Sequence, residues 1–164
     1  MKVFLVRHAI AHERNRARWP NDALRPLTPA GRRKFVKAAR GLAAVLPRSA
    51  ALLTSPLVRA RDTAGILAKS LGGRNAIECD ELASGEPAHK VFTLLRARKE
   101  RAVILVGHEP NLSTLLSACL HEHAQIKFDF KKGGAVCVEF GSRIQPGRAT
   151  LRWMLPPRIS STLR

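Results

Sequence analysis

Short apolar runs alternate with longer segments of helical periodicity through the first 120 residues of the chain. Brief, mostly apolar runs bounded by charged or turn residues are typical of buried strands. This pattern predicts strands over residues 2–6, 51–55 and 102–106, with a shorter one over 76–79. The segment 12–27 is polar, rich in arginine and interrupted by prolines, which indicates a loop.

Helical periodicity fills the intervals between these strands. Thr28 offers an N-cap and Pro29 suits the first helical position, and apolar residues then recur at helical spacing until Pro47 ends the pattern. A second apolar stripe follows Pro56 and ends before Gly72. The predicted helices are residues 29–46, 56–71, 88–97 and 111–120.

The last third of the chain has a different pattern. Residues 134–140 and 149–155 alternate or run apolar and are separated by glycine and proline, which predicts a hairpin-like pair of strands. The alternation of strands and helices before them predicts a three-layer α/β/α sandwich with a largely parallel central sheet and helices on both faces. We expect one compact domain over residues 1–155, without a large inserted cap, and a loose C-terminal tail over 156–164.

Composition limits the class of protein further. The three cysteines among 164 residues are widely separated, which fits reduced thiols and neither a disulfide framework nor a zinc site. No apolar run is long enough to cross a bilayer and no signal peptide is evident, so we expect a soluble, cytoplasmic protein without membrane insertion. The formal charge of +17 favours anionic partners or merely reflects solubility, and two tryptophans with no tyrosine argue against specific nucleic-acid recognition.

Histidines and arginines follow the predicted strands at the points where those strands end. Arg7 and His8 follow the first strand, Arg59 lies one turn into the helix after the second, and His108 follows the strand at 102–106. Ligands of open α/β sheets bind beyond the carboxyl ends of the strands. The sequence therefore predicts that two imidazoles and two guanidinium groups converge at one edge of the sheet.

Such a group of side chains suits a phosphoryl group. A guanidinium presents a planar set of donors that matches phosphate oxygens and stays charged at working pH. A histidine that is neutral near pH 7 has a ring nitrogen free to attack phosphorus. Fixed cations and N–H groups then stabilise the charge on the transferring group, and His108 could act in this way if protonated or donating through one nitrogen.

Four segments resemble motifs of the histidine phosphatase (phosphoglycerate mutase-like) superfamily. Residues 6–9 (VRHA) are similar to its Arg-His-Gly signature, 55–64 (SPLVRARDTA) to its Ser-Pro-x-x-Arg-Ala-x-x-Thr-Ala stretch, and 106–108 (VGH) to its second histidine motif. Residues 22–28 (DALRPLT) resemble the short branch typified by the bacterial phosphohistidine phosphatase SixA. The likeness extends from about residue 1 to 120 in the family's order, and together the motifs are specific.

The resemblance implies a phosphatase with a two-step mechanism and without a metal or organic cofactor. It implies that His8 accepts the phosphoryl group, that Arg7 and Arg59 hold phosphate, and that His108 stabilises the transferring group. Water would then hydrolyse the phosphorylated His8. We expect the substrate-binding residues to be Arg7, Arg59, Arg25, Asp22 and Glu109.

The chain departs from the family pattern at two points. Ala9 replaces the glycine that follows the nucleophile, so the backbone there must tolerate a Cβ. A proton-donating acid is not evident, and Asp22, Glu81 and Glu86 are the candidates. An imidazole leaves phosphorus readily once its ring is protonated, so a missing acid favours phosphohistidine, or another activated phosphoryl group, over sugar phosphates.

Plainer roles compete for some of these residues. Asp22 and Arg25 could form a structural pair that fixes the loop, which we favour over direct catalysis because loop ion pairs are common. Ser55 fits a helix cap. Residues 121–123 (HEH) lack the spacing of a zinc-binding helix, so we expect no metal there.

Three functions are compatible with the sequence. The first is a phosphatase acting on phosphohistidine in a protein, whose acidic surface would dock on the basic chain. The second is a phosphatase for a small phosphorylated metabolite. The third is a basic module that binds phosphate or nucleic acid without catalysis, against which the two intact histidines argue. The sequence does not indicate an oligomeric state.

Overall fold

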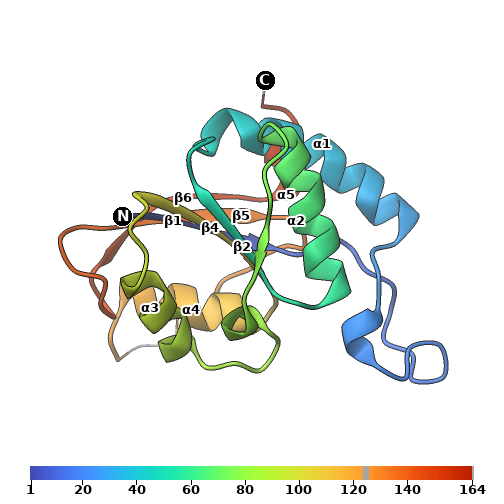
Figure 1. Cartoon of the computed structure of the whole chain (residues 1–164), viewed down its shortest axis with the longest axis horizontal. Helices are drawn as coiled ribbons and strands as arrows, with labels where there is room; N and C mark the ends of the chain where they lie inside the picture. Colours follow the sequence, from blue (N-terminus) through green and yellow to red (C-terminus); the bar gives the residue numbers. More distant parts are fainter. Residues whose placement is uncertain (124–125, 164) are drawn as a thin grey trace.

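A six-stranded mixed sheet forms the middle layer of the structure, a computed structural model that describes residues 1–123 and 126–163 (Figure 1). The strand order is β3-β2-β4-β1-β5-β6, in which β3, β2, β4 and β1 run parallel while β5 is antiparallel to both of its neighbours. The strands are β1 (Lys2–Arg7), β2 (Ala51–Thr54), β3 (Ile77–Glu78), β4 (Ala102–Gly107), β5 (Ala135–Phe140) and β6 (Ala149–Leu155). The predicted three-layer α/β class, with a mostly parallel sheet, is confirmed.

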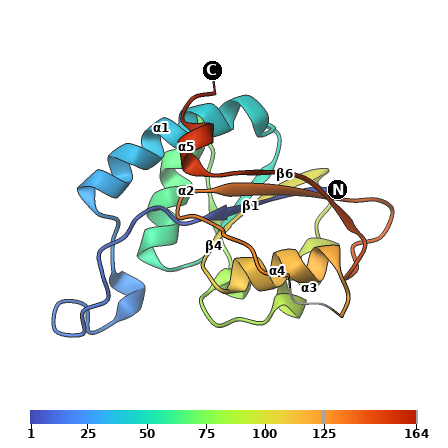
Figure 2. The same ribbon diagram turned by 180° about the vertical axis from the view of Figure 1, so that it is seen from behind.

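Helices cover both faces of this sheet. On one face lie α1 (Pro29–Val45), α2 (Val58–Ser70) and α5 (Pro157–Ser160), and on the other lie α3 (Ala88–Arg96) and α4 (Asn111–Leu120) (Figures 1 and 2). Two short 3-10 helices, η1 (Asp22–Leu24) and η2 (Asp80–Leu82), interrupt the loops that follow β1 and β3.

The central strands are apolar throughout because helices bury both of their sides. Successive side chains of a strand point to opposite faces of the sheet. In β1, Phe4 and Val6 accordingly pack into the core beneath α1 and α2, whereas Val3 and Leu5 pack into the core on the side of α3 and α4. Burial on both sides fixes β1 and β4 firmly in the middle of the molecule, and with them the residues that follow their ends.

The start of α1 follows the predicted capping pattern. The Oγ1 atom of Thr28 accepts a hydrogen bond from the Gly31 amide at 2.9 Å, and Pro29 occupies the first turn. Gly31 also lets the helix approach the loop after β1, because a Cβ there would lie 2.1 Å from the carbonyl oxygen of Ile10. The helix is thereby held close to the segment that follows His8.

The expectation of a loose tail over residues 156–164 is wrong for its described part. Helix α5 packs against α1, and Ser160 is fully buried. The contact depends on Gly41, since a Cβ at that position would lie 1.7 Å from the Ser160 carbonyl oxygen. The two prolines that suggested a loose segment instead lead into and begin this short helix, and Arg164 lies outside the described residues.

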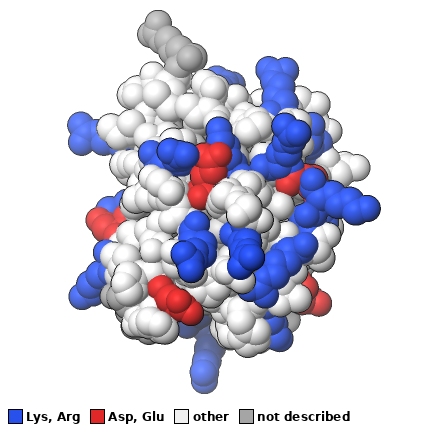
Figure 3. All heavy atoms as spheres, turned by 90° about the vertical axis from the view of Figure 1, so that its left-hand side faces the viewer, with Lys and Arg blue, Asp and Glu red and all other residues white. Residues whose placement is uncertain are grey.

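Positive charge is spread widely over the surface. On the face where β1 begins, Lys and Arg side chains are scattered over the whole surface, and few acidic side chains lie among them (Figure 3). An isolated basic side chain therefore does not mark a site in this protein. Among the described residues, no helix combines the length and the apolar character needed to cross a membrane.

Candidate active site

The two histidines predicted to converge lie side by side. In the parallel pair β1–β4, Arg7 is opposite Gly107, so His8 and His108 follow at the same level of the sheet. The His8 amide donates to the Gly107 carbonyl oxygen at 3.0 Å, and the two imidazole centroids are 5.1 Å apart. Both residues are buried. The adjacency of two strands that are almost a hundred residues apart in sequence thus creates the pair.

One nitrogen of the His8 ring is committed to the backbone. Nδ1 lies 2.7 Å from the carbonyl oxygen of Ala9. A carbonyl oxygen can only accept, so Nδ1 carries the proton and donates. In the neutral ring this leaves Nε2 with a free lone pair. The backbone therefore selects the tautomer that a nucleophilic histidine requires.

Burial keeps both imidazoles neutral. It lowers the pKa of His8 to about 3, and the positive charges of Arg59, Arg7 and Lys132 add to this effect against the hydrogen bond to Ala9. Burial also lowers the pKa of His108 to about 3, with further contributions from His8 and Arg59. At neutral pH His108 therefore has one N–H group and no charge before a ligand binds.

Ser55 is a partner of His108 that the sequence did not suggest. Its Oγ lies 2.8 Å from Nε2 of His108, while the Leu57 amide donates to the same Oγ at 3.3 Å. Helix α2 begins at Val58, and no side chain of the described residues caps its N-terminus. The expected role of Ser55 as a helix cap therefore reduces to the long contact with Leu57, and its short contact is with the histidine. The Nδ1 atom of His108 is buried without a hydrogen-bond partner among the described residues.

Arg59 enters the site from the first turn of α2. Its side chain is 3% exposed, with Nη2 3.1 Å from Oδ2 of Asp22 and Nη1 donating to the Asp22 carbonyl oxygen at 2.9 Å. Its Nε is buried and has no partner in the part of the chain that the structure describes. Burial lowers the pKa of Arg59, and the carboxylate of Asp22 opposes this shift. Asp22 thus holds the guanidinium in place while the Nε–H group stays available as a donor.

Asp22 is held in turn by Arg25. The Nε of Arg25 donates to Oδ1 of Asp22 at 2.8 Å, and its Nη1 donates to the His12 carbonyl oxygen. Partial burial acts to raise the pKa of Asp22, but the hydrogen bond from Arg25 and the charges of Arg59, Arg25 and Arg14 outweigh it and lower that pKa. The geometry matches the structural pair favoured from the sequence, with Arg59 as an additional partner.

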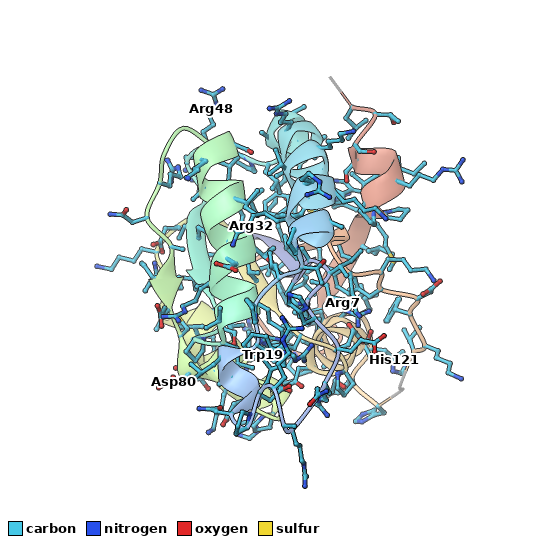
Figure 4. The ribbon with its side chains drawn as sticks, turned by 90° about the vertical axis from the view of Figure 1, so that its right-hand side faces the viewer. Arg7, Trp19, Arg32, Arg48, Asp80 and His121 are labelled. Carbon is cyan, nitrogen blue, oxygen red and sulfur yellow. The ribbon has the colours of Figure 1, made fainter. Side chains whose placement is uncertain are left out.

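Arg7 is anchored to a backbone carbonyl rather than to a carboxylate. Its Nη1 donates to the Phe130 oxygen at 2.6 Å, and its Nε is buried without a partner among residues 1–123 and 126–163. Burial lowers the pKa of Arg7, and the negative charges of Glu109 and Asp129 oppose that shift. Glu109 is half-buried, and one of its carboxylate oxygens, Oε1, is buried without a hydrogen-bond partner from the described part of the chain. Arg7 lies near the centre of the view in Figure 4.

Thr63 joins the segment after the nucleophile candidate to α2. Its Oγ1 donates to the Arg59 carbonyl oxygen at 2.7 Å and accepts from the Ala9 amide at 3.0 Å. Ala9 takes the place of the family's glycine without strain, because no described residue other than glycine has a positive φ. The methyl group of Ala9 is buried in the core beneath α1 and α2.

The remaining acid candidates share a small hollow with His108. Glu81 and Glu86 line it together with Gly107 and His108. Glu86 forms an ion pair with Lys90 at 2.6 Å. Residues 121–123 are exposed, and in the described ranges no three His, Cys, Asp or Glu side chains are grouped so that they could hold a metal ion.

Comparison with known proteins assigns the chain to a family. The model of the histidine phosphatase superfamily, branch 1, matches residues 3–84, which is half of the chain. The chain belongs to this superfamily. It is therefore a phosphatase, and the predicted family relationship is confirmed, including its likeness to the SixA branch.

Three similar proteins illustrate the relationship. An uncharacterised protein of Picosynechococcus is 30% identical over 95% of this chain and its own full length. A protein of Agrobacterium tumefaciens assigned as the phosphohistidine phosphatase SixA has 26% identity and a TM-score of 0.75, over 95% of this chain and 97% of that one. The protein histidine phosphatase SixA, solved with tungstate, has 24% identity and a TM-score of 0.82, over 96% of this chain and 98% of that one, and shares the fold.

Proposed function

We propose that this phosphatase removes the phosphoryl group from phosphohistidine in proteins, using His8 as a transient acceptor. The observation that carries the proposal is the hydrogen bond from Nδ1 of His8 to the Ala9 carbonyl oxygen, in a ring that burial keeps neutral. A neutral imidazole with a fixed tautomer presents Nε2 as a nucleophile without any prior loss of a proton.

The reaction divides into two displacements at phosphorus. In the first, the Nε2 lone pair of His8 forms a P–N bond while the bond between phosphorus and the substrate imidazole breaks, and the leaving imidazole takes up a proton. In the second, water attacks phosphorus and the bond to Nε2 breaks, which releases phosphate and restores His8. The proton lost by water balances the proton taken up by the substrate, so the net reaction is hydrolysis.

The other side chains of the site bind and stabilise the transferring group. The unpartnered Nε atoms of Arg7 and Arg59 supply N–H donors on anchored guanidinium groups. If the Ser55 hydroxyl donates to Nε2 of His108, the single proton of the neutral ring lies on Nδ1. The Nδ1–H group is then free to donate a hydrogen bond to the phosphoryl group. Donors held in place before the reaction stabilise the charge on the equatorial oxygens at no cost of rearrangement.

The state of the acidic side chains favours a phosphoramidate over a phosphoester. Asp22 has a lowered pKa and forms ion pairs with three arginines, Arg14, Arg25 and Arg59, so it is a poor proton donor. The Glu86 carboxylate is paired with Lys90. A protonated imidazole is a good leaving group, whereas an alkoxide needs an acid to assist it. The likeness to the Agrobacterium protein assigned as SixA supports the same choice of substrate.

Trapping the intermediate tests the proposal directly. After a brief incubation with a phosphohistidine peptide and quenching in base, mass mapping should locate the phosphate on His8. His8→Ala should lose at least about a thousandfold in kcat because no nucleophile remains. His89→Ala, which removes an exposed imidazole from α3, is the matched control and should keep wild-type turnover. Phosphate on another residue, or equal rates for His8→Ala and the wild type, would contradict the proposal.

The same assay separates the competing substrate class. A phosphatase for small metabolites should hydrolyse phosphoserine or sugar phosphates at least as efficiently as the phosphohistidine peptide. The proposed function predicts a clear preference for the peptide.

A further inference from the structure

A concave region lies beside the segment that follows His8. It is a cavity of about 330 Å³ between α1, the turn at Lys132 and Gly133, and α5. Ile10 and Phe35 contribute to its apolar lining, and its cationic residues are Lys34, Lys37, Lys132 and Arg158. The volume falls in the range of pockets that take organic groups.

The cavity adjoins the segment that follows His8, and the charge of Lys132, which lines it, acts on the His8 imidazole. Ala9 and Ile10, which line it, are the two residues after His8. The Gly133 amide donates to the carbonyl oxygens of Arg7 at 3.0 Å and of His8 at 3.2 Å, so the turn that carries Lys132 is attached to the same segment. A polypeptide whose phosphorylated side chain reaches His8 can therefore extend its neighbouring residues into the cavity.

Four basic side chains surround this cavity, and none of them has an acidic neighbour there in the described ranges. Within the described residues, none of Lys34, Lys37, Lys132 and Arg158 forms an ion pair with an acidic side chain, and no acidic residue lines the cavity. Lys131, by contrast, pairs with Asp129 at 2.7 Å and Arg32 with Asp62 at 2.8 Å. Three separate elements thus bring like charges around one hollow, and an anionic ligand bound there would reduce their mutual repulsion.

We propose that this cavity binds Asp and Glu side chains that flank the phosphohistidine of the substrate protein. This inference rests on the proposed function and specifies the substrate sequence that the enzyme prefers. Carboxylates on short methylene chains use both the cations and the apolar lining.

The test compares two phosphohistidine peptides that differ only in the residues beside the phosphorylated histidine. One has Asp and Glu there and the other has Asn and Gln. The wild-type enzyme should favour the acidic peptide by about tenfold in kcat/KM at low ionic strength, at roughly threefold for each lysine engaged. The preference should decline as salt is added, because exposed charges are screened.

A pair of double variants isolates the cavity from the overall charge. Lys34→Gln with Lys37→Gln should abolish most of the preference and leave hydrolysis of a small aryl phosphate unchanged. Arg40→Gln with Arg48→Gln removes the same charge from exposed positions on α1 and just beyond its end that do not line the cavity, and should keep the preference (Figure 4 labels Arg48).

The outcomes separate this inference from the function on which it rests. Equal kcat/KM for the two peptides in the wild type would overturn the acidic-flank proposal and leave the phosphohistidine phosphatase intact. Parallel losses on both peptides and on the aryl phosphate in the lysine variant would also overturn it, since the lysines would then act on the phosphoryl group. Absence of turnover with either peptide would overturn the proposed function and this inference together.

Discussion

The arginines at the sheet edge and the cations of the neighbouring cavity have the same charge and opposite constraints. Arg59 is almost completely buried and held by two contacts to Asp22, whereas Lys34 and Lys37 are exposed and without an acidic partner in the described residues. The contacts of Arg59 fix the direction in which its guanidinium N–H groups point. The lysines of the cavity provide only a positive electrostatic potential. The comparison indicates that the edge is built for one geometry of phosphate and the cavity for a range of carboxylates.

Exchanging arginine and lysine should produce the largest difference in kcat/KM between the sheet edge and the cavity. Arg59→Lys retains the charge but loses the planar set of donors, so kcat/KM should fall by about a hundredfold on every substrate. Lys34→Arg should change kcat/KM by less than about twofold, because only the charge is used there. Steady-state kinetics on the acidic peptide and on an aryl phosphate provide both values. Similar losses in the two variants would abolish the distinction.

Weakening the contact between Asp22 and Arg59 should lower kcat by a smaller factor. Asp22→Asn leaves a hydrogen-bonding group but weakens the hold on the guanidinium, and kcat should fall by about tenfold with little change in KM. A positioning role requires that the loss disappear when Arg59 is already altered. We therefore expect the Asp22→Asn, Arg59→Lys double variant to match Arg59→Lys alone. Additive losses would instead place Asp22 in direct contact with the substrate.

The free energy of unfolding should depend on pH through the two buried histidines at the sheet edge. The folded pKa of His8 and of His108 is about 3, below the unfolded value near 6.5, so the unfolded chain binds more protons between these limits. Unfolding therefore becomes easier as pH falls below about 6.5. Between pH 6 and 5 the loss should be on the order of 1 kcal/mol per histidine.

Denaturant unfolding across that range provides the measurement. The wild type should lose stability from pH 7 to pH 5, and a variant with His8→Asn and His108→Asn should lose distinctly less. The double charge variant of Lys34 and Lys37 serves as the control and should show the wild-type slope. An unchanged slope in the histidine variant would refute the assignment of buried, neutral imidazoles.

Local sequence signals were sufficient for most of the fold. The cap at Thr28, the stop near Pro47 and the apolar runs of β1 and β4 each depend on residues within a few positions of one another. The rule that strand ends meet at one edge then brought His8 and His108 together, and the structure shows their rings in contact distance. These features could be predicted because short-range physics determines them.

The contacts that hold the site residues in place could not be predicted from local sequence in this way. Ser55 and His108 are 53 residues apart, Arg7 and the Phe130 carbonyl 123, and Ala9 and Thr63 54. Each contact depends on how distant segments pack, and a serine before a proline looks the same in sequence whether it caps a helix or holds a histidine. Helix α5 was missed for a related reason, since its burial depends on Gly41, far away along the chain.

Thr63 has a consequence for how this enzyme can diversify. Its one hydroxyl group ties the backbone beside the nucleophile candidate to the helix that carries Arg59. His8 and Arg59 are consequently held at a fixed separation, which neither mutation nor thermal motion readily alters. Selectivity for new partners must then be acquired around this fixed module, in the surrounding loops and in the hollow beside α1, while the chemical step stays the same.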